Sequence, residues 1–344
     1  MKDEEILNHL LLRQVKKRDK ANELGSDLQK DLFLDVKFQK KVSKADREWA
    51  EKELELIKKH GASIVPITSD EYPESLKHIH SPPFCLYVLG KLPRHNIPHI
   101  AVVGTRKASH YGLKMSQDLS RELSRSGVVI VSGLARGCDT YAHIGALEGG
   151  GLTVAVLGTG LDTVYPREND KLFNKIAKQG AVITEFPFGT PPLPHNFPAR
   201  NRIISGLSQA VIVAEAPLKS GAMMTARMAL DEGREVFAVP GKTTSDKSSG
   251  TNQLIKDGAM LVDSAEDILK AFSIEVKKES KADQRVKLNG NEEKIIEAVS
   301  DEPVHIDSLL NKTGLAIKDL SYILLDLELR GLIKQLSGNL YIKT

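Results

Sequence analysis

The sequence has few cysteines and no long apolar run. Its 344 residues include only Cys85 and Cys138, too few for a disulfide framework, which favours a reducing cytoplasm. No apolar run approaches the roughly 20 residues that a membrane-spanning helix needs. The N-terminus, Met1 to Glu5, is acidic and lacks the apolar core of a signal peptide. These absences predict a cytoplasmic protein without a membrane partner.

Aromatic residues and net charge are also scarce. Aromatic residues make up 5% of the chain, and 48 Lys and Arg against 45 Asp and Glu leave a formal net charge of only +3. An excess this small does not by itself indicate nucleic-acid binding, so a local basic cluster would have to provide it. The low aromatic content also argues against an extensive surface for stacking bases.

From residue 100 onward, short apolar runs alternate with stretches at helical spacing. Continuous Val and Ile runs separated by helices are typical of strands buried on both faces of a parallel sheet. The expected strands are residues 100–103, 128–131, 153–157, 181–184, 210–214, 236–239 and 260–262. The pattern predicts an α/β fold with a Rossmann-like, doubly wound, mostly parallel sheet over residues 61–272, in which 61–99 form an extended, proline-rich lead-in.

Three further segments flank this sheet domain. Residues 1–60 are polar and helical in character, which predicts a small N-terminal helical region that caps the next domain. Residues 273–291 are charged and have no apolar period, as in a linker. Residues 292–344 contain three helical patterns and then two short apolar runs around Ser337-Gly338-Asn339, which predicts a C-terminal winged helix.

Four strand-to-helix loops combine glycine with serine, threonine or arginine, and such loops meet at one edge of a parallel sheet. A further connection, between two expected strands, contains two arginines and a phenylalanine. Glycine lets backbone amides approach a phosphate, arginine binds it, and an aromatic ring can stack on a base. The candidate binding residues are Gly104, Thr105, Arg106, Lys107, Ser132, Gly133, Arg136, Gly137, Phe197, Arg200, Asn201, Arg202, Ser220, Gly221 and Thr225.

Some residues near these loops also have a purely structural interpretation. Arg200 could be a buried, paired arginine rather than a ligand-binding group. Asp139 follows the second loop, where an N-cap of the next helix is its ordinary role. His143 on that helix is more typical of a packing residue than of a catalytic one.

Several familiar motifs are incomplete, which argues against the cofactors that they would bind. Gly158-x-Gly160 is followed by Thr163 where a dinucleotide fingerprint has its third glycine, which disfavours NAD. Gly241-Lys242-Thr243 looks like the end of a P-loop, but Val236 stands at the position of the leading glycine, so ATP binding has no support. The histidines lack the spacing of a metal site. We therefore expect no cofactor and no metal.

Across about residues 61–272 the sequence resembles the DNA-processing protein A (DprA/Smf) family, because six motifs occur in the family's order. They are Val103–Arg106, Val131–Asp139, Phe197–Leu207, Ser220–Ala226, Val239–Gly241 and Ser249–Ala259. The tail resembles the winged-helix domain that some members carry. The resemblance implies a homodimeric single-stranded DNA-binding protein, not an enzyme, that loads the RecA recombinase during natural transformation in competent cells.

The resemblance also implies residue roles. Arg106, Arg136, Arg200 and Arg202 would contact or shape the phosphate path, and Phe197 would pack against a base. Some members have a lysine shortly before that phenylalanine, where this chain has Pro194-His195-Asn196.

The sequence also allows two other functions. Nucleotide phosphoribohydrolases of the LOG, or lysine-decarboxylase-like, type belong to the same superfamily, but here Met228 stands where their carboxylate should be. The winged helix could alternatively act as a transcription regulator. However, residues 285–344 hold 8 Lys and Arg against 9 Asp and Glu, and a duplex-reading helix normally carries positive charge. We therefore expect this module to serve protein contact or regulation.

Overall fold

A nine-stranded sheet organises the first of two compact units, residues 1–277 and 278–344. The computed structural model describes residues 3–19, 42–94, 96–274, 288–300 and 302–343. Seven parallel strands appear where the apolar runs predict them: β3 (His99–Val103), β4 (Val129–Ser132), β5 (Thr153–Val156), β6 (Ala181–Thr184), β7 (Ala210–Val213), β8 (Glu235–Ala238) and β9 (Met260–Leu261). With β1 (Ser63–Pro66) and β2 (Cys85–Gly90) from the lead-in, the strand order is β1-β2-β6-β5-β4-β3-β7-β8-β9. The doubly wound, mostly parallel fold is therefore confirmed, and its switch point lies between β3 and β7.

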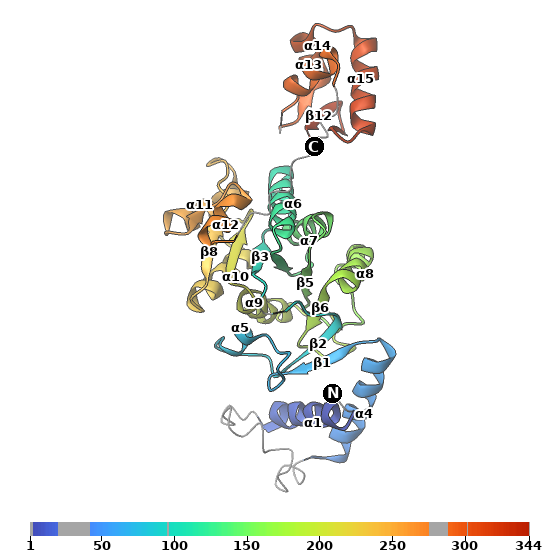
Figure 1. The fold of residues 1–344 in the computed structure, drawn as a ribbon, viewed down its shortest axis with the longest axis vertical. Helices are drawn as coiled ribbons and strands as arrows, with labels where there is room; N and C mark the ends of the chain where they lie inside the picture. The colour runs from blue at the N-terminus through green and yellow to red at the C-terminus, as the bar shows by residue number, and fades with distance from the viewer. Residues whose placement is uncertain (1–2, 20–41, 95, 275–287, 301, 344) are drawn as a thin grey trace. The chain divides into compact units, whose positions relative to one another are not determined.

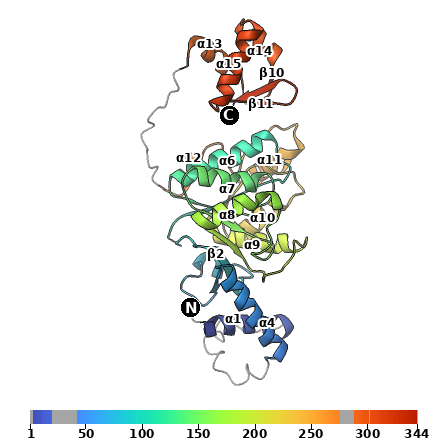
Figure 2. The ribbon, with the colours of Figure 1, turned by 90° about the vertical axis from the view of Figure 1, so that its right-hand side faces the viewer.

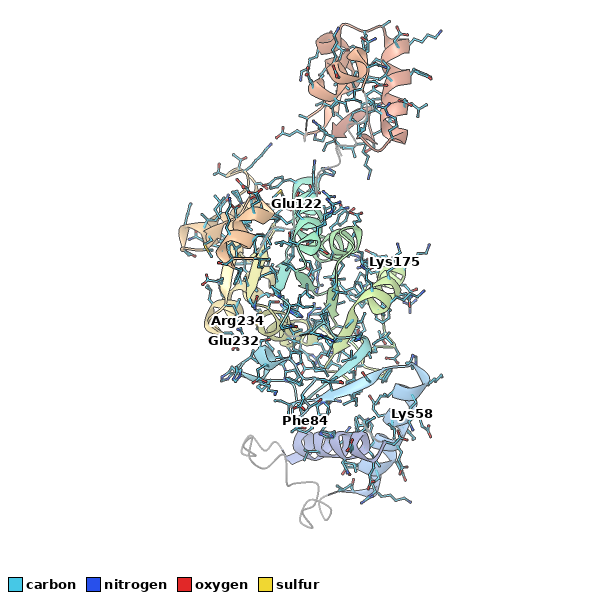
Figure 3. The ribbon with its side chains drawn as sticks, in the orientation of Figure 1. Lys58, Phe84, Glu122, Lys175, Glu232 and Arg234 are labelled. Carbon is cyan, nitrogen blue, oxygen red and sulfur yellow. The ribbon has the colours of Figure 1, made fainter. Side chains whose placement is uncertain are left out.

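Two antiparallel strands from the lead-in extend the sheet. Strand β2 (Cys85–Gly90) pairs with β6, and β1 (Ser63–Pro66) pairs with β2 at the edge. The short helix α5 (Glu74–Lys77) lies between them in the sequence. It is tied to the turn after α10 (Gly221–Asp231), because Arg234 donates to the Ser75 carbonyl oxygen at 3.0 Å and Glu232 accepts from the His80 amide at 2.9 Å. Figure 3 labels Arg234 and Glu232. The lead-in is thus an integral part of the sheet rather than only a connection.

Helices cover both faces of the sheet because its strands are apolar on both faces. On β4, Val129 and Val131 face one core cluster and Ile130 faces another. The first face is covered by α9 (Asn196–Leu207) and α10 (Gly221–Asp231), and the second by α6 (His110–Arg125), α7 (Cys138–Glu148) and α8 (Asp170–Gln179) (Figure 1). Figure 2 shows α6, α7 and α8 side by side. The helices α11 (Ser249–Lys256) and α12 (Ala265–Ala271) complete the two layers.

Two N-terminal helices pack at the end of the sheet that carries β2. Helix α1 (Asp3–Asp19) buries Leu10, Leu11 and Leu12 in one core cluster with Ile57 of α4 (Lys44–Lys59). Arg13 of α1 donates to the Tyr87 hydroxyl at 3.2 Å and to the main-chain oxygen of Glu185 at 2.7 Å. None of the helices in the described ranges is long and apolar enough to cross a membrane.

The second unit has the winged-helix order. Its helices are α13 (Gly290–Ala298), α14 (Ile306–Thr313) and α15 (Ile317–Leu329). Its strands are β10 (Val304–His305), β11 (Ile333–Leu336) and β12 (Leu340–Lys343), and they form a sheet of order β10-β12-β11. Its core includes Leu309, Leu320 and Leu324. Helix α13 begins at Gly290 after the capping residue Asn289, so the last residues of the expected linker are helical. Of that linker, residues 275–287 lie outside the described residues.

Candidate nucleic-acid interface

A hollow of about 830 Å³ lies at the carboxyl ends of the parallel strands, beside the switch point between β3 and β7. It is bounded by the loops after β3 and β7 and by the first half of α9. Its charged lining residues are the cationic Arg106, Lys107, Arg200, Lys219 and Lys247 and the acidic Asp139 and Asp246. The excess of cations makes the hollow suited to an anionic ligand.

Most of the candidate residues do meet in one place. Those that line the large hollow are Gly104, Thr105, Arg106, Lys107, Phe197, Arg200, Asn201, Ser220, Gly221 and Thr225. A second, smaller hollow adjoins it and adds Gly133 and Arg136, while Arg106 and Phe197 line both. Ser132, Gly137 and Arg202 line neither hollow.

The glycines of the first two loops serve the close approach of one loop to the other. A Cβ on Gly104 would lie 2.4 Å from the Cys138 Sγ, and one on Gly137, whose φ is +76°, would lie 2.3 Å from the Thr105 oxygen. The amides are engaged as well, because Thr105 N donates to the Glu215 oxygen at 2.7 Å and Gly133 N to Asp139 Oδ2 at 3.1 Å. The expectation that the amides of these loops approach a phosphate is therefore wrong for Thr105 and Gly133, whose amides donate to protein oxygens.

Glu215, which follows β7, anchors the loop after β3 through its buried carboxylate. It is 2% exposed, and its carboxylate accepts from the amide and the hydroxyl of Ser109, both at 2.7 Å. Ser109 in turn caps α6 by accepting from the Gly112 amide. A buried carboxylate with these partners fixes the position of the loop that carries Arg106 and Lys107.

Arg200 points into the protein rather than into the hollow's opening. It is 3% exposed, and its Nη1 donates to the Gly133 oxygen at 2.7 Å and to the Val156 oxygen. Gly133 has no side chain because a Cβ there would lie 2.5 Å from the Arg200 guanidinium. Arg200 therefore joins α9 to the ends of β4 and β5, and we assign it a positioning role rather than a direct phosphate contact.

Burial sets the protonation of the groups around Arg200. It lowers the pKa of Arg200 to about 10, so the guanidinium stays charged at neutral pH, and it raises the pKa of Asp139. Burial, and secondarily the charge of Arg200, lowers the pKa of His143 to about 3. Asp139 does not cap α7, whose N-cap is Gly137, and instead accepts from the preceding loop. His143 is a buried packing residue that contacts Thr153 Oγ1 at 2.7 Å.

Arg106 is the exposed arginine of the hollow. Its Cζ lies over the Phe197 ring, 4.9 Å from the centroid, in a cation–π contact. Lys107, Lys219 and Lys247 are also exposed. Arg136 forms a bidentate pair with Glu168 at 2.7–2.8 Å, but both side chains are more than half exposed, so the pair adds little stability and can be exchanged.

Two candidate residues have their polar groups engaged elsewhere. The Ser132 hydroxyl is fully buried and donates to the Val102 oxygen at 2.7 Å, so it is a sheet contact and not a ligand contact. Arg202 forms a bidentate pair with Glu185, both bonds at 2.7 Å, and each side chain is 19% exposed. Arg202 can shape the position of α9, but its charge is neutralised where it lies.

The helix α10 opens onto the hollow at its N-terminus. The Ser220 hydroxyl caps the helix by accepting from the Met223 amide at 3.3 Å, and the buried Thr225 hydroxyl donates to the Gly221 oxygen at 3.1 Å. Gly221 itself is exposed and has open space where a Cβ would be. The first turn of an eleven-residue helix thus adds its positive dipole end to the cationic lining.

Sequence reasoning missed several residues of the hollow. Lys219 and Lys247 are lysines in loops, and only their place after strands β7 and β8 could have suggested them. Tyr165 lines both hollows, its ring centroid 5.5 Å from that of Phe197, although 32 positions separate the two residues in the sequence. The one feature of the sequence that could have indicated Tyr165 is that it is an aromatic residue in the connection that follows β5.

The hollows suit binding better than hydrolysis. Histidine, cysteine and glutamate are absent from their described lining, and of the two aspartates, Asp139 is buried against Gly133. Position 228 on α10 is a methionine, so it cannot supply the carboxylate that glycosidic hydrolysis would use there. Within the described ranges, no group of three or more His, Cys, Asp or Glu side chains is placed to hold a metal ion.

Comparison with known proteins places both units in one family. The family model described as DNA recombination-mediator protein A matches residues 63–273, and the model of the DprA winged helix domain matches residues 279–339. Protein Smf of Escherichia coli (strain K12) is 39% identical over 283 residues, which cover 80% of this chain and 76% of that protein.

Two solved structures are similar in fold and sequence. DNA processing protein A of Streptococcus pneumoniae has a TM-score of 0.65 and 36% identity, covering 78% of this chain and 98% of that one. DNA processing protein A of Helicobacter pylori, whose structure was described for its unique single-stranded DNA binding mode, has a TM-score of 0.56 and 32% identity, covering 62% of this chain and 95% of that one.

Proposed function

The chain belongs to the DNA recombination-mediator protein A family, and from this premise we propose that it binds single-stranded DNA in the large hollow and loads a RecA-type recombinase onto the strand. The family is one of recombination mediators rather than of enzymes. We further propose that it acts as a cytoplasmic homodimer on DNA that enters the cell by natural transformation.

The observation that carries the DNA proposal is the combination of Arg106 and Phe197 at the mouth of a cation-lined hollow. Cationic side chains bind the phosphate backbone of any sequence, and an aromatic ring stacks on the face of a base. The faces of bases are accessible in a single strand and hidden in a duplex. A site of this composition therefore favours single strands and shows little sequence preference.

The homodimer has support in one exposed edge of the sheet. Strand β9 is the last strand, and its Met260 and Leu261 are 39% and 49% exposed. An uncovered edge strand with apolar side chains is a ready surface for pairing with another chain. Two copies on one strand would also bind more tightly than one, because the second contact becomes intramolecular.

The winged helix is proposed as a protein-contact module and not as a second DNA reader. In its helix α15, Tyr322 is 75% and Leu325 is 57% exposed, and Lys318 is accompanied by Asp319 and Asp326. A helix that enters the major groove brings net positive charge and polar side chains to base edges. The face of α15 has neither in excess.

A binding titration tests the proposal. Labelled single-stranded and duplex oligonucleotides of matched composition are titrated with the full chain at several salt concentrations, and fluorescence anisotropy gives the affinity. We expect tighter binding of the single strand by at least about tenfold, and a slope of log K against log salt of about −3 if four lining cations contact phosphates. Equal binding of both forms, or no dependence on salt, would contradict the proposed DNA site.

The mediator part is tested separately. RecA filament formation is followed on single strands that are already coated with single-strand binding protein, with and without the chain. We expect faster filament formation when the chain is present. Tight binding of the strand without any acceleration would retain the DNA site and remove the loading role.

A further inference from the structure

Phe197 is enclosed more than its place in the motif suggests. The Arg106 guanidinium lies over its ring, 4.9 Å from the centroid. Gly158 lies against its edge, where a Cβ would be 2.9 Å from Phe197 Cδ1. The Tyr165 ring adjoins it at a centroid distance of 5.5 Å and an interplanar angle of 43°. A base can therefore stack on Phe197 only after the Arg106 side chain has moved from the ring.

Tyr165 is the more open of the two rings. It is 39% exposed, whereas Phe197 is only partly exposed, and it lines both the large and the small hollow. In the described part of the chain, no hydrogen bond engages its hydroxyl. A ring at the boundary of two hollows, without a polar partner to hold it for a structural purpose, is available to a ligand.

The loop that carries Tyr165 is held firmly in place. The Thr159 hydroxyl donates to the Thr163 oxygen at 2.7 Å, and the Asn169 side chain donates to the Leu134 oxygen at 2.9 Å. These bonds brace the loop internally and against the second strand loop. The loop backbone that carries Tyr165 is thus already ordered, so binding does not have to order it, which favours affinity.

We propose that Tyr165 stacks on a nucleobase of the bound strand and forms, with Phe197, a platform for two neighbouring bases. The inference rests on the proposed single-strand binding. Arg106 and Arg136 line the small hollow together with Tyr165, so in this proposal they contact the phosphates on either side of the stacked base. When the strand binds, Arg106 exchanges the Phe197 ring for a phosphate, and a base takes its place over the ring.

Strands with and without bases test the stacking role. The full chain and three variants are titrated with a labelled oligothymidylate and with a strand of equal length whose sugars carry no base. Tyr165→Leu removes the ring, Tyr165→Phe keeps it, and Tyr322→Leu removes an exposed tyrosine from the second unit as a matched control. Melting temperatures confirm that each variant is folded.

We expect Tyr165→Leu to weaken binding of the oligothymidylate by about 5- to 150-fold, the range for one stacked base. Its binding of the base-free strand should stay within about twofold of wild type, as should both affinities of Tyr165→Phe and Tyr322→Leu. As a second readout, the fluorescence of a 2-aminopurine base in the strand should fall on binding to wild type and less on binding to Tyr165→Leu.

Two outcomes would overturn the inference. If Tyr165→Leu weakens both strands equally, the ring has a packing role. If it weakens neither, the ring does not contact the strand. Both outcomes leave wild-type binding intact, whereas a wild-type chain that binds neither strand would instead remove the proposed function itself.

Discussion

Both units of the chain present a surface of the kind that their folds use for ligands, yet the two surfaces differ in chemistry. The edge of the large sheet gathers exposed cations, among them Arg106, around a hollow of about 830 Å³. The outer face of α15 in the winged helix shows Tyr322 and Leu325 instead, with acidic residues beside a single lysine. A winged helix is thus a scaffold, and the residues on its surface decide whether it binds DNA or protein.

The two surfaces also differ in what lies beneath them. Under the sheet edge is a buried polar cluster in which Arg200, Asp139 and His143 are 0–6% exposed. Under α15 lies an apolar core that includes Leu320 and Leu324. The first surface therefore depends on buried charges in fixed positions, and the second on ordinary apolar packing.

The largest expected effect comes from removing the buried cation. Arg200→Met leaves Asp139 buried without its counter-charge and the Gly133 and Val156 oxygens without their donor, so we expect a loss of about 3–5 kcal/mol in the free energy of unfolding. Arg125→Met, at an exposed position on α6, serves as the control and should stay within about 0.5 kcal/mol of wild type. Urea unfolding measures both. If the Arg200→Met variant were as stable as wild type, the buried charges around Arg200 would not be needed to hold the sheet edge in place.

A smaller loss in the free energy of unfolding is expected when the pH is lowered, because His143 is buried. Thr153 Oγ1 donates to the Ile130 oxygen, so His143 Nδ1 must be the donor to Thr153, and the buried Nε2 has no partner among the described residues. The folded protein therefore keeps His143 neutral down to a pKa of about 3, whereas the unfolded chain protonates it near its ordinary value of 6.5. Stability from this group is present above pH 6.5 and is lost as the pH falls, by about 2 kcal/mol at pH 5.

Urea unfolding of wild type and His143→Gln at pH 7 and pH 5 measures this term. The loss between the two pH values should be smaller in the variant by about 2 kcal/mol. His305→Gln, at an exposed histidine of the second unit, is the matched control variant. An identical pH dependence of wild type and His143→Gln would contradict the prediction.

The smallest expected effects are changes in DNA affinity, and they compare the edge of the large sheet directly with the face of α15. Arg106→Gln removes an exposed cation that we propose binds phosphate, so we expect about tenfold weaker binding of every single strand, whatever its sequence, and a shallower salt dependence. Lys318→Gln makes the same kind of change on α15 and should alter the affinity by less than about twofold. Anisotropy titrations measure both. A larger loss for Lys318→Gln than for Arg106→Gln would reverse the assignment of the DNA surface.

The sequence predicted the parallel strands to within one residue at each end, because continuous Val and Ile runs have few other interpretations. It did not predict that β1 and β2 join the sheet, since short proline-flanked runs such as Ser63–Pro66 carry no sign of their partner. Among site residues, the motifs located Arg106 and Arg200 equally well. Only the structure separates them, because the direction of a guanidinium depends on groups far away in sequence, such as the glycine at position 133.

Glu185 links the first helix of the chain, α1, to α9. Its main-chain oxygen accepts from Arg13 of α1, and its carboxylate holds Arg202 of α9. One residue thus connects the N-terminal helices to the helix that carries Phe197. Truncating or displacing α1 would therefore disturb α9 and, with it, the hollow at the carboxyl ends of the strands, so the N-terminal helices support the proposed binding site as well as cover the sheet.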